Sequence, residues 1–197
     1  MSKTVRRVAL ATGSAALLAT SFTGTASAAT DSGSAPLIDG KPAVLISPED
    51  AQRVLSADGA TAAADAPSYY IRNNNSFRCL VVQGFDNGKT AMQYDCANYA
   101  DQRWYFFGST WNRVQVINAN SGKCLVTQGA NNGAQAFQYT CGNYNDQFWK
   151  VEGNPSGSFK LVSNNSWKCL AVQGYNNGAI PFQFDCAAYK DQDWTLA

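Results

Sequence analysis

Apolar and polar side chains alternate over short stretches in the C-terminal two thirds of the chain, as they do in half-buried β-strands. Residues 78–83 and 91–95 alternate in this way, and the pair Asn87-Gly88 lies between them. Asn-Gly between two alternating runs is a strong hairpin signal, because both residues tolerate a positive φ. The sequence therefore predicts a β-hairpin here. Two flanking strands are predicted at 70–72 and 102–106.

The same pattern returns twice more with a period of 45 residues. In each copy a Ser-x-x-Cys-Leu segment is followed by Gln-Gly, Asn-Gly and a closing Asp-Gln-x-Trp. One copy cannot bury its own apolar face, but three copies closed in a ring can. The sequence therefore predicts an all-β domain at 69–197, with three 45-residue repeats, twelve short strands and pseudo-threefold symmetry.

The first residues have the features of a secretory signal peptide. Basic residues among the first seven precede an apolar run at 8–18 and a small-x-small cleavage site at 26–28. An uncleaved membrane anchor is disfavoured, because the run is shorter than the roughly 20 residues that span a bilayer. We expect residues 1–28 to be removed and the protein to be secreted and extracellular, with no membrane association.

A change of composition separates this leader from the repeats. Residues 29–68 contain no aromatic residue and no cysteine, and Ala, Ser, Gly, Asp and Pro dominate them. Too little apolar surface is present to offset the entropy of ordering, so the segment is predicted to be a flexible linker or propeptide. Ser47-Pro48-Glu49-Asp50 is a good helix start and predicts a short helix near 48–56, able to dock on the domain.

Six cysteines, two in each repeat, indicate a disulfide framework in a secreted chain. Threefold symmetry leaves few of the fifteen arithmetically allowed sets of pairs. A cysteine metal site would need closely spaced pairs such as Cys-x-x-Cys, which the sequence lacks, so no metal and no cofactor are expected. The predicted pairs close three equal loops: Cys79–Cys96, Cys124–Cys141 and Cys169–Cys186.

Composition excludes several function classes. The chain has 15 basic and 14 acidic residues, without the basic surplus that a nucleic-acid partner requires. It has no histidine, which removes Ser-His-Asp and Cys-His catalysis and His-ligated metals. The acidic residues of the repeats are spread around the predicted ring, and Glu152 is the only glutamate there. Since paired carboxylates in a cleft are not indicated, no enzyme activity is expected.

The three Gln-x-Trp units, each with a Cys-Leu opening and a Cys closing its hairpin, resemble the ricin-B-type β-trefoil lectins. The resemblance covers all three repeats and about two thirds of the chain. It implies a β-trefoil, in which a six-strand barrel is capped by three hairpins. It also implies that each Trp fills the shared core, that each Gln bonds within its unit, and that the domain binds carbohydrate.

The resemblance also implies where sugar would bind. In that family an aromatic two residues before the second Cys stacks on the sugar, while the Gln of Gln-x-Trp and the polar residue before it add hydrogen bonds. An outward-facing Gln recurs in every repeat as well. The candidate carbohydrate-binding residues are Tyr94, Asp101, Gln102 and Gln83 in the first repeat, Tyr139, Asp146, Gln147 and Gln128 in the second, and Phe184, Asp191, Gln192 and Gln173 in the third.

One family feature is missing. The Asp that grips sugar hydroxyls, two residues after the first Cys, is replaced by Val81, Val126 and Ala171. Alternation also places Met92 in the pocket wall, which makes the wall more apolar. Two functions therefore compete. One is a non-catalytic carbohydrate-binding module with up to three weak sites for a glycan or polysaccharide, and the other is a protein-binding trefoil that has lost sugar binding. In both cases a monomer is expected.

Overall fold

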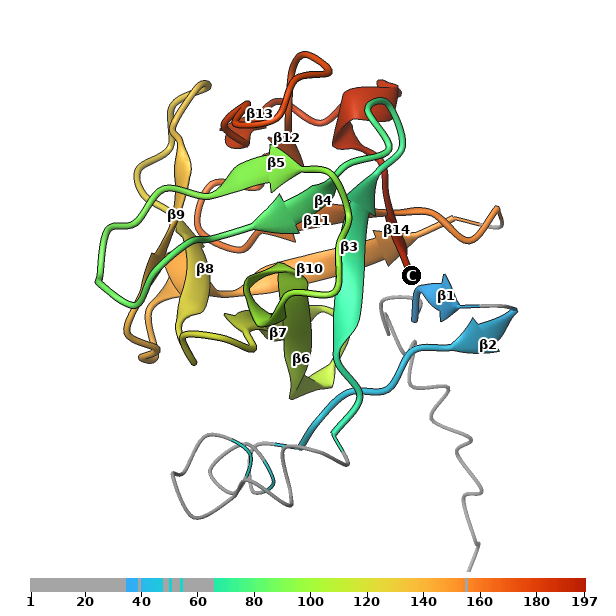
Figure 1. The fold of residues 1–197 in the computed structure, drawn as a ribbon, viewed down its shortest axis with the longest axis vertical. Coiled ribbons are helices and arrows are strands. Elements are labelled where there is room, and N and C mark those ends of the chain that lie inside the picture. Colours follow the sequence, from blue (N-terminus) through green and yellow to red (C-terminus); the bar gives the residue numbers. More distant parts are fainter. Residues whose placement is uncertain (1–34, 39, 48–49, 51–53, 55–65, 155) are drawn as a thin grey trace, which may run out of the picture. The chain divides into compact units, whose positions relative to one another are not determined.

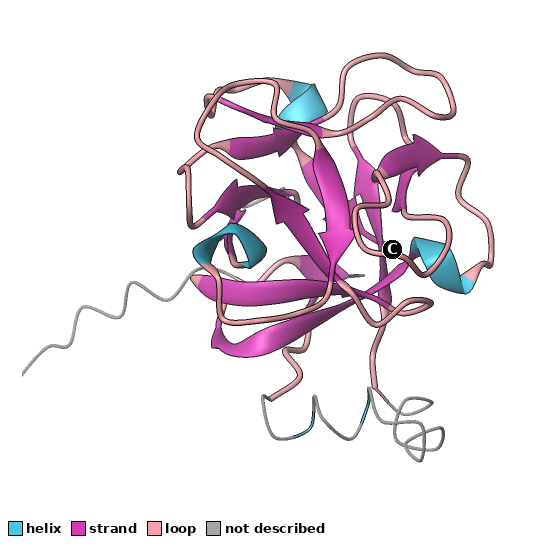
Figure 2. Cartoon of the chain, turned by 90° about the vertical axis from the view of Figure 1, so that its left-hand side faces the viewer, coloured by secondary structure: helices cyan, strands magenta, loops and turns pink. Residues whose placement is uncertain are grey.

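The computed structural model describes residues 35–38, 40–47, 50, 54, 66–154 and 156–197. The predicted signal peptide and much of the predicted linker lie outside these residues. The described residues from 66 onwards form strands and loops, with short 3-10 turns between them, so the all-β prediction is confirmed for the repeats (Figure 2). The 3-10 turns are η2 (Ala100–Gln102), η3 (Asn145–Gln147) and η4 (Lys190–Gln192).

Six strands close into a barrel, as the resemblance implies (Figure 1). Around the ring, β3 pairs with β6, β6 with β7, β7 with β10, β10 with β11, β11 with β14, and β14 with β3, each time antiparallel. Because the ring returns to β3, none of the six strands leaves an open edge. Their bounds are β3 (Tyr69–Asn73), β6 (Arg103–Thr110), β7 (Arg113–Asn118), β10 (Trp149–Gly153), β11 (Phe159–Ser163) and β14 (Trp194–Leu196).

Three hairpins complete the trefoil. Their strands are β4 (Cys79–Val81) with β5 (Met92–Tyr94), β8 (Cys124–Thr127) with β9 (Ala136–Tyr139), and β12 (Cys169–Ala171) with β13 (Phe182–Phe184). In each hairpin the first cysteine lies opposite the aromatic residue of the candidate site. The three pairs recur at intervals of 45 residues: Cys79 with Tyr94, Cys124 with Tyr139, and Cys169 with Phe184.

The predicted Asn-Gly hairpin turn is wrong in one respect. In the first hairpin, strand β4 ends at Val81 and strand β5 begins at Met92. Asn87-Gly88 therefore lies within a long connection and does not join the two strands directly. Gly88 has a φ of +81°, as the turn prediction requires, but the local turn does not set the strand ends. Contacts with the next repeat set them.

The connection of each repeat docks on the repeat that follows it around the ring. The Gly88 N–H donates to the Gln138 carbonyl at 2.8 Å, and the Thr140 N–H donates to Asn87 Oδ1 at 2.8 Å. These bonds satisfy backbone groups that a tight hairpin would have paired locally. The repeats are therefore joined by their loops as well as through the barrel.

A buried glutamine strengthens each of these junctions. Gln93 accepts a hydrogen bond from Ser76 Oγ at 2.6 Å and donates to the carbonyls of Gly174 and Asn176 at 3.0 and 3.1 Å. The side chain therefore ties a turn of its own repeat to the loop of a neighbour. A buried polar network that is fully satisfied fixes one arrangement of the parts it joins. The equivalent buried glutamines are Gln138 and Gln183.

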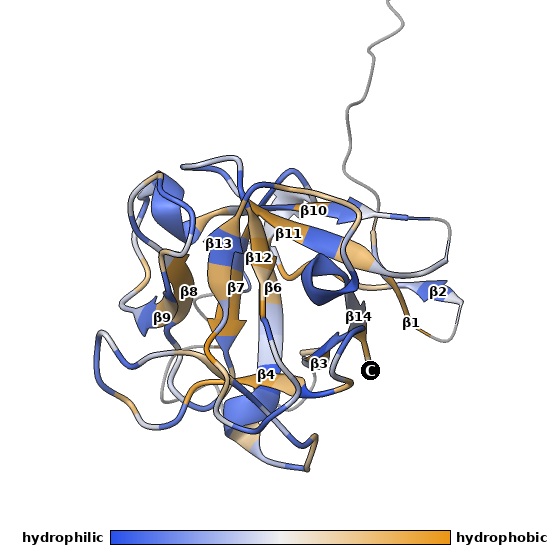
Figure 3. Ribbon diagram, turned by 90° about the horizontal axis from the view of Figure 1, so that it is seen from above, coloured by the Kyte–Doolittle hydropathy of each residue, from blue (hydrophilic) through white to orange (hydrophobic). Residues whose placement is uncertain are grey.

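The core contains the three repeated tryptophans. Trp104, Trp149 and Trp194 are fully buried, as the resemblance implies. Each indole Nε1–H donates to a leucine carbonyl of its own repeat at 2.9–3.0 Å, so its polar group is satisfied without water. Hydrophobic colouring is concentrated along strands such as β7 and β8, while much of the loop surface is hydrophilic (Figure 3).

The cysteines pair within each repeat, as predicted: Cys79–Cys96, Cys124–Cys141 and Cys169–Cys186. Each bridge spans 17 residues of sequence and ties the opening strand of a hairpin to the loop after its second strand. In the chain-entropy description a loop of this size contributes about 3 kcal/mol to stability. The described residues contain no free cysteine.

Part of the predicted linker packs against the barrel. The short strands β1 (Leu37–Ile38) and β2 (Lys41–Pro42) form a hairpin, and Ala43 reaches the main core. Ile46 runs parallel to β6: its N–H donates to the Phe106 carbonyl at 2.9 Å, and its carbonyl accepts from the Gly108 N–H at 3.1 Å. This segment therefore differs from a free linker, because two of its apolar side chains, Ala43 and Ile46, are buried against the barrel.

The predicted helix start is also visible. The Asp50 N–H donates to Ser47 Oγ at 3.1 Å, which is the N-cap contact that the Ser-Pro-Glu-Asp run predicts. Asp50 and Val54 have helical geometry, and Val54 is buried beside Ile46 and Phe107. The remainder of the predicted helix at 48–56 lies outside the described residues.

Candidate functional site

A hollow of about 220 Å³ brings together the candidate residues of the first repeat. Strand β4 supplies its floor at Val81, strand β5 supplies Tyr94, and the turn η2 supplies Asp101. Gln83 lies at the rim, just after β4 ends. The lining residues are Val81, Gln83, Tyr94, Asp95, Ala97, Tyr99, Asp101 and Gln102.

The third repeat has an equivalent but larger hollow, of about 510 Å³. Phe184 and Asp191 occupy the places of Tyr94 and Asp101, and Gln173 lies at the rim. Two further residues distinguish it from the hollow of the first repeat: Asn75, which belongs to the first repeat, and Lys190. The lining residues are Asn75, Gln173, Gly174, Phe184, Tyr189, Lys190 and Asp191.

In the second repeat, Gln128 lines a hollow of about 370 Å³ with a different set of residues, among them Thr90 and Phe137. Tyr139 is exposed like its two equivalents. The backbone around Asp146 also differs. In the other two repeats an asparagine side chain donates to the aspartate carbonyl, Asn118 to Asp101 and Asn73 to Asp191, whereas the equivalent position in the second repeat is Ser163. The three repeats therefore offer different surfaces.

The carboxyl groups are incompletely satisfied within the protein. The Oδ1 atoms of Asp101, Asp146 and Asp191 are buried and have no hydrogen-bond partner. The backbone behind the first of them is firmly held, since the Asp101 carbonyl accepts from Asn118 Nδ2 at 2.8 Å. A buried acceptor without a donor costs free energy. Each aspartate as a whole is only partly buried, and Asp101 and Asp191 line the hollows of their repeats.

Burial raises the pKa of Asp101 above its ordinary value of 3.8, although its own backbone amide partly offsets the effect. Burial likewise raises the pKa of Asp191, and the nearby backbone amides and Lys160 lower it by less. Both carboxyl groups are therefore less well solvated than an exposed aspartate. Such groups gain more from a donor placed beside them than a fully hydrated carboxylate does.

The aromatic side chains present open faces. Tyr94 is 42% exposed and Phe184 is 40% exposed, although each lies on a paired strand. Tyr99 and Tyr189 line the same hollows and are still more exposed. A carboxylate acceptor beside a flat apolar face suits a ligand that has hydroxyl donors on one side and C–H groups on the other.

The glutamines of Gln-x-Trp hold the loop that carries the aspartates. Gln102 Oε1 accepts from the Ala97 N–H at 2.7 Å, and its Nε2 donates to the Asp95 carbonyl at 2.9 Å. The second and third repeats have the same two bonds, so the intra-repeat bonding that the resemblance implies is confirmed. These side chains are buried and engaged, and they position the neighbouring aspartate. The two equivalent glutamines are Gln147 and Gln192.

Two features of the site were not visible in the sequence. Asn75 belongs to the first repeat but lines the hollow of the third. Residue spacing within one repeat does not predict a contribution from another repeat. The prediction that Met92 lies in the pocket wall is wrong, because Met92 does not line the hollow of the first repeat. Next to Met92, the Ala91 N–H donates to the Ala136 carbonyl at 2.9 Å, so this part of the first hairpin lies against the hairpin of the second repeat.

Within the part of the chain that the structure describes, no group of three or more His, Cys, Asp or Glu side chains is placed to hold a metal ion. The same described residues include no helix with the length and apolar character needed to cross a membrane.

Solved structures with similar folds include ThreeFoil, a designed threefold-symmetric protein, with a TM-score of 0.64 and 24% identity over 66% of this chain and 97% of that one. An exo-β-1,3-galactanase from Clostridium thermocellum has a TM-score of 0.65 and 26% identity over 68% of this chain, which spans only 30% of the galactanase chain. A ricin B-like lectin from Macrolepiota procera, solved in complex with lactose, has a TM-score of 0.58 and 17% identity over 66% of this chain and 94% of the lectin.

The sequence model of the ricin-type β-trefoil lectin domain-like family matches residues 54–131 and 100–184, which together make up more than half of the chain. A search of curated proteins found no match. The family match includes residues from all three repeats and agrees with the closed barrel and its three hairpins. The chain therefore belongs to the ricin-type β-trefoil lectin domain-like family.

Proposed function

We propose that the protein is a non-catalytic carbohydrate-binding module, with up to three weak sites on three equivalent 45-residue repeats of four strands each. The observation that carries this proposal is the meeting of a partly buried aspartate and an exposed aromatic side chain in one hollow. Asp101 meets Tyr94 in the first repeat, and Asp191 meets Phe184 in the third. The second site is assigned to Tyr139 and Asp146 by equivalence of position.

The chemistry of a sugar ring fits this arrangement. Its hydroxyls donate hydrogen bonds to a carboxylate, and such charge-assisted bonds are worth about 1.5–3 kcal/mol each. Its C–H face packs on an aromatic ring. Gln83, Gln128 and Gln173 are exposed at the rims and add donors and acceptors there. Sites of about millimolar affinity, near −4 kcal/mol, still retain a polymer when several engage at once.

The alternative, a protein-binding trefoil, is motivated by the apolar replacements at the family's gripping Asp. Val81, Val126 and Ala171 are each only 1% exposed. Val81 lines the hollow of the first repeat, and all three residues add almost no exposed apolar surface. This favours the carbohydrate-binding proposal, in which Asp101, Asp146 and Asp191 take over hydroxyl recognition from the missing residue.

Galactose-containing glycans are the first probes to use, because the similar structures include a lectin with bound lactose and a β-1,3-galactanase. The test is retention of the protein on immobilised lactose and on insoluble β-1,3-galactan, within a broad glycan panel. The triple variant Asp101→Asn, Asp146→Asn, Asp191→Asn should elute with an inert protein. Asp86→Asn, a change at an exposed aspartate outside the hollows, should elute with the unaltered protein. Failure of the unaltered protein to be retained by any glycan would reject the proposal.

We further propose that residues 1–28 direct export and that the mature protein acts outside the cell as a monomer. Three disulfides suit an oxidising compartment. N-terminal sequencing of protein recovered from culture fluid should begin at Ala29, or further along if the segment at 29–68 is trimmed as a propeptide. A secreted form that begins at Met1 would contradict this.

A further inference from the structure

The hollow of the third repeat crosses a boundary between repeats. Asn75, which belongs to the first repeat, lines it together with Gly174 and Phe184 of the third. All the residues that line the hollow of the first repeat come from that repeat alone. The larger of the two hollows is therefore a composite of two repeats.

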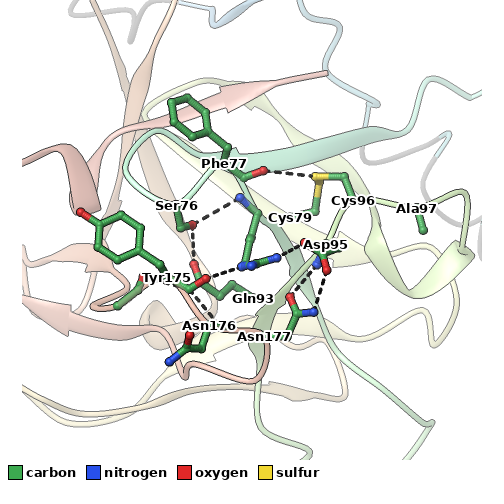
Figure 4. Close-up of polar contacts among 12 residues, drawn as sticks. Ser76, Phe77, Cys79, Gln93, Asp95, Cys96, Ala97, Tyr175, Asn176 and Asn177 are labelled. Atoms are coloured by element: carbon green, nitrogen blue, oxygen red, sulfur yellow. Dashed lines mark hydrogen bonds and ion pairs between the residues drawn. A yellow bond between two sulfur atoms is a disulfide. The ribbon is translucent and has the colours of Figure 1, made fainter.

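The residues at this boundary are fixed by several hydrogen bonds (Figure 4). Asn177 donates from Nδ2 to Asp95 Oδ2 at 2.8 Å and accepts from the Asp95 N–H at 2.9 Å. The Arg78 side chain donates from Nε to the Tyr175 carbonyl. These contacts hold the loop of the third repeat against a turn of the first, so the boundary is a preformed surface.

Tyr175 stands on this loop with its ring open to solvent, 63% exposed. Its hydroxyl donates to Asn75 Oδ1 at 3.2 Å, which orients the ring beside the asparagine that lines the hollow. The bond from Arg78 to this loop does not depend on the Tyr175 ring, because Arg78 donates to the backbone carbonyl of Tyr175. The exposed ring therefore contributes surface next to the hollow and little to holding the junction.

The other two repeats differ at this position. Phe85 replaces Tyr175 in the first repeat and lacks a hydroxyl, and Ala130 replaces it in the second and lacks a ring. Among these three equivalent loops, only the loop beside the hollow of the third repeat has an aromatic side chain bonded to an asparagine of the next repeat.

We infer that the third hollow extends across the repeat boundary and binds a glycan chain of several sugars. This rests on the proposed function. One sugar occupies the hollow between Phe184 and Asp191, and the next sugars follow Asn75 onto the face of Tyr175. The site is thereby assigned to oligosaccharides, whereas the hollow of the first repeat, with its lining confined to one repeat, accommodates a single terminal sugar.

The test is affinity as a function of chain length, measured by calorimetry with lactose and with β-1,3-linked galactose oligomers of two to six residues. All measurements use a protein that carries Asp101→Asn and Asp146→Asn, so that the sites of the first and second repeats are inactivated and only binding at the third hollow is measured. The affinity should rise about tenfold from the dimer to the tetramer, which is the gain expected when one additional ring contact of about 1.4 kcal/mol is made. Tyr175→Ala and Asn75→Ala should each reduce this gain to less than twofold.

Three further variants keep the outcomes distinct. Tyr175→Phe retains the ring and should retain most of the gain, and Phe85→Ala, at the matched position of the first repeat, should leave it unchanged. Equal affinity at all chain lengths, with binding abolished by Asp191→Asn, would overturn the extended site and leave the proposed function standing. A gain with length that survives Tyr175→Ala would also overturn it. No saturable binding of any of these sugars would reject the proposed function itself, and this inference with it.

Discussion

Replacing Asp191 by Asn should separate binding from stability. The Asp191 carboxyl has one buried oxygen without a partner, and burial raises its pKa despite the amides beside it. A raised pKa means that the folded state penalises the charged form at neutral pH. An unsatisfied buried group costs about 1–3 kcal/mol. Because this residue is only partly buried and solvent screens its charge, the lower end applies.

Asp191→Asn is therefore expected to raise the free energy of unfolding by about 0.5–1 kcal/mol, or to leave it unchanged, while glycan binding at that site is lost. Urea denaturation at pH 7 measures the change as a shift of the midpoint at constant slope. The matched control is Asp185→Asn in the same repeat. There the carboxylate accepts from Lys168 and Asn132, which lower its pKa, so the same substitution should not stabilise the protein.

A loss of more than about 1 kcal/mol in Asp191→Asn would refute this reasoning. It would show that the carboxyl group stabilises the η4 turn and that its burial does not cost the folded state stability. No side-chain cap bond is present at the start of that turn, which is why the opposite result is expected.

Three further outcomes are expected. Glycan affinity should fall as the pH is lowered, and the fall should begin above pH 3.8. The pKa values of Asp101 and Asp191 are raised, so these carboxylates are protonated at a higher pH than a free aspartate. An affinity that stays constant down to pH 3.8 would count against a role of the carboxylates. Ile46→Ala should lower the free energy of unfolding by about 2–4 kcal/mol, since Ile46 is buried against the barrel; a change below about 0.5 kcal/mol in urea denaturation would show that the segment does not contribute. Phe77→Gly should raise the free energy of unfolding by about 1 kcal/mol, because Phe77 has a φ of +59° where the second repeat has Gly122. A loss of stability in urea denaturation would mean that the exposed ring makes a stabilising contact.

The repeat made most of the fold predictable from the sequence. Trp149 and its equivalents recur with the cysteines at one fixed interval, and symmetry then restricts both the core positions and the disulfide pairs. The closed ring follows because one repeat has no way to bury its apolar face. The ends of the hairpin strands were less predictable, because Asn87-Gly88 bonds to the second repeat and the local turn signal does not contain that contact.

The candidate site was predictable to the same extent. Tyr94 and Asp101 were identified by their positions relative to the cysteine and the Gln-x-Trp, and the structure places them in one hollow. Asn75 was not identifiable, since it lies far from Phe184 in sequence and meets it only through closure of the ring. The role of Gln102 was ambiguous between ligand contact and loop support until its two backbone bonds were visible.

The most direct test of the central claim is a crystal structure of the protein with lactose bound. The account predicts a sugar ring stacked on Tyr94 or Phe184, with a hydroxyl within hydrogen-bonding distance of Asp101 or Asp191. A sugar bound elsewhere on the domain, with these carboxyl groups unchanged and still without a partner, would contradict it.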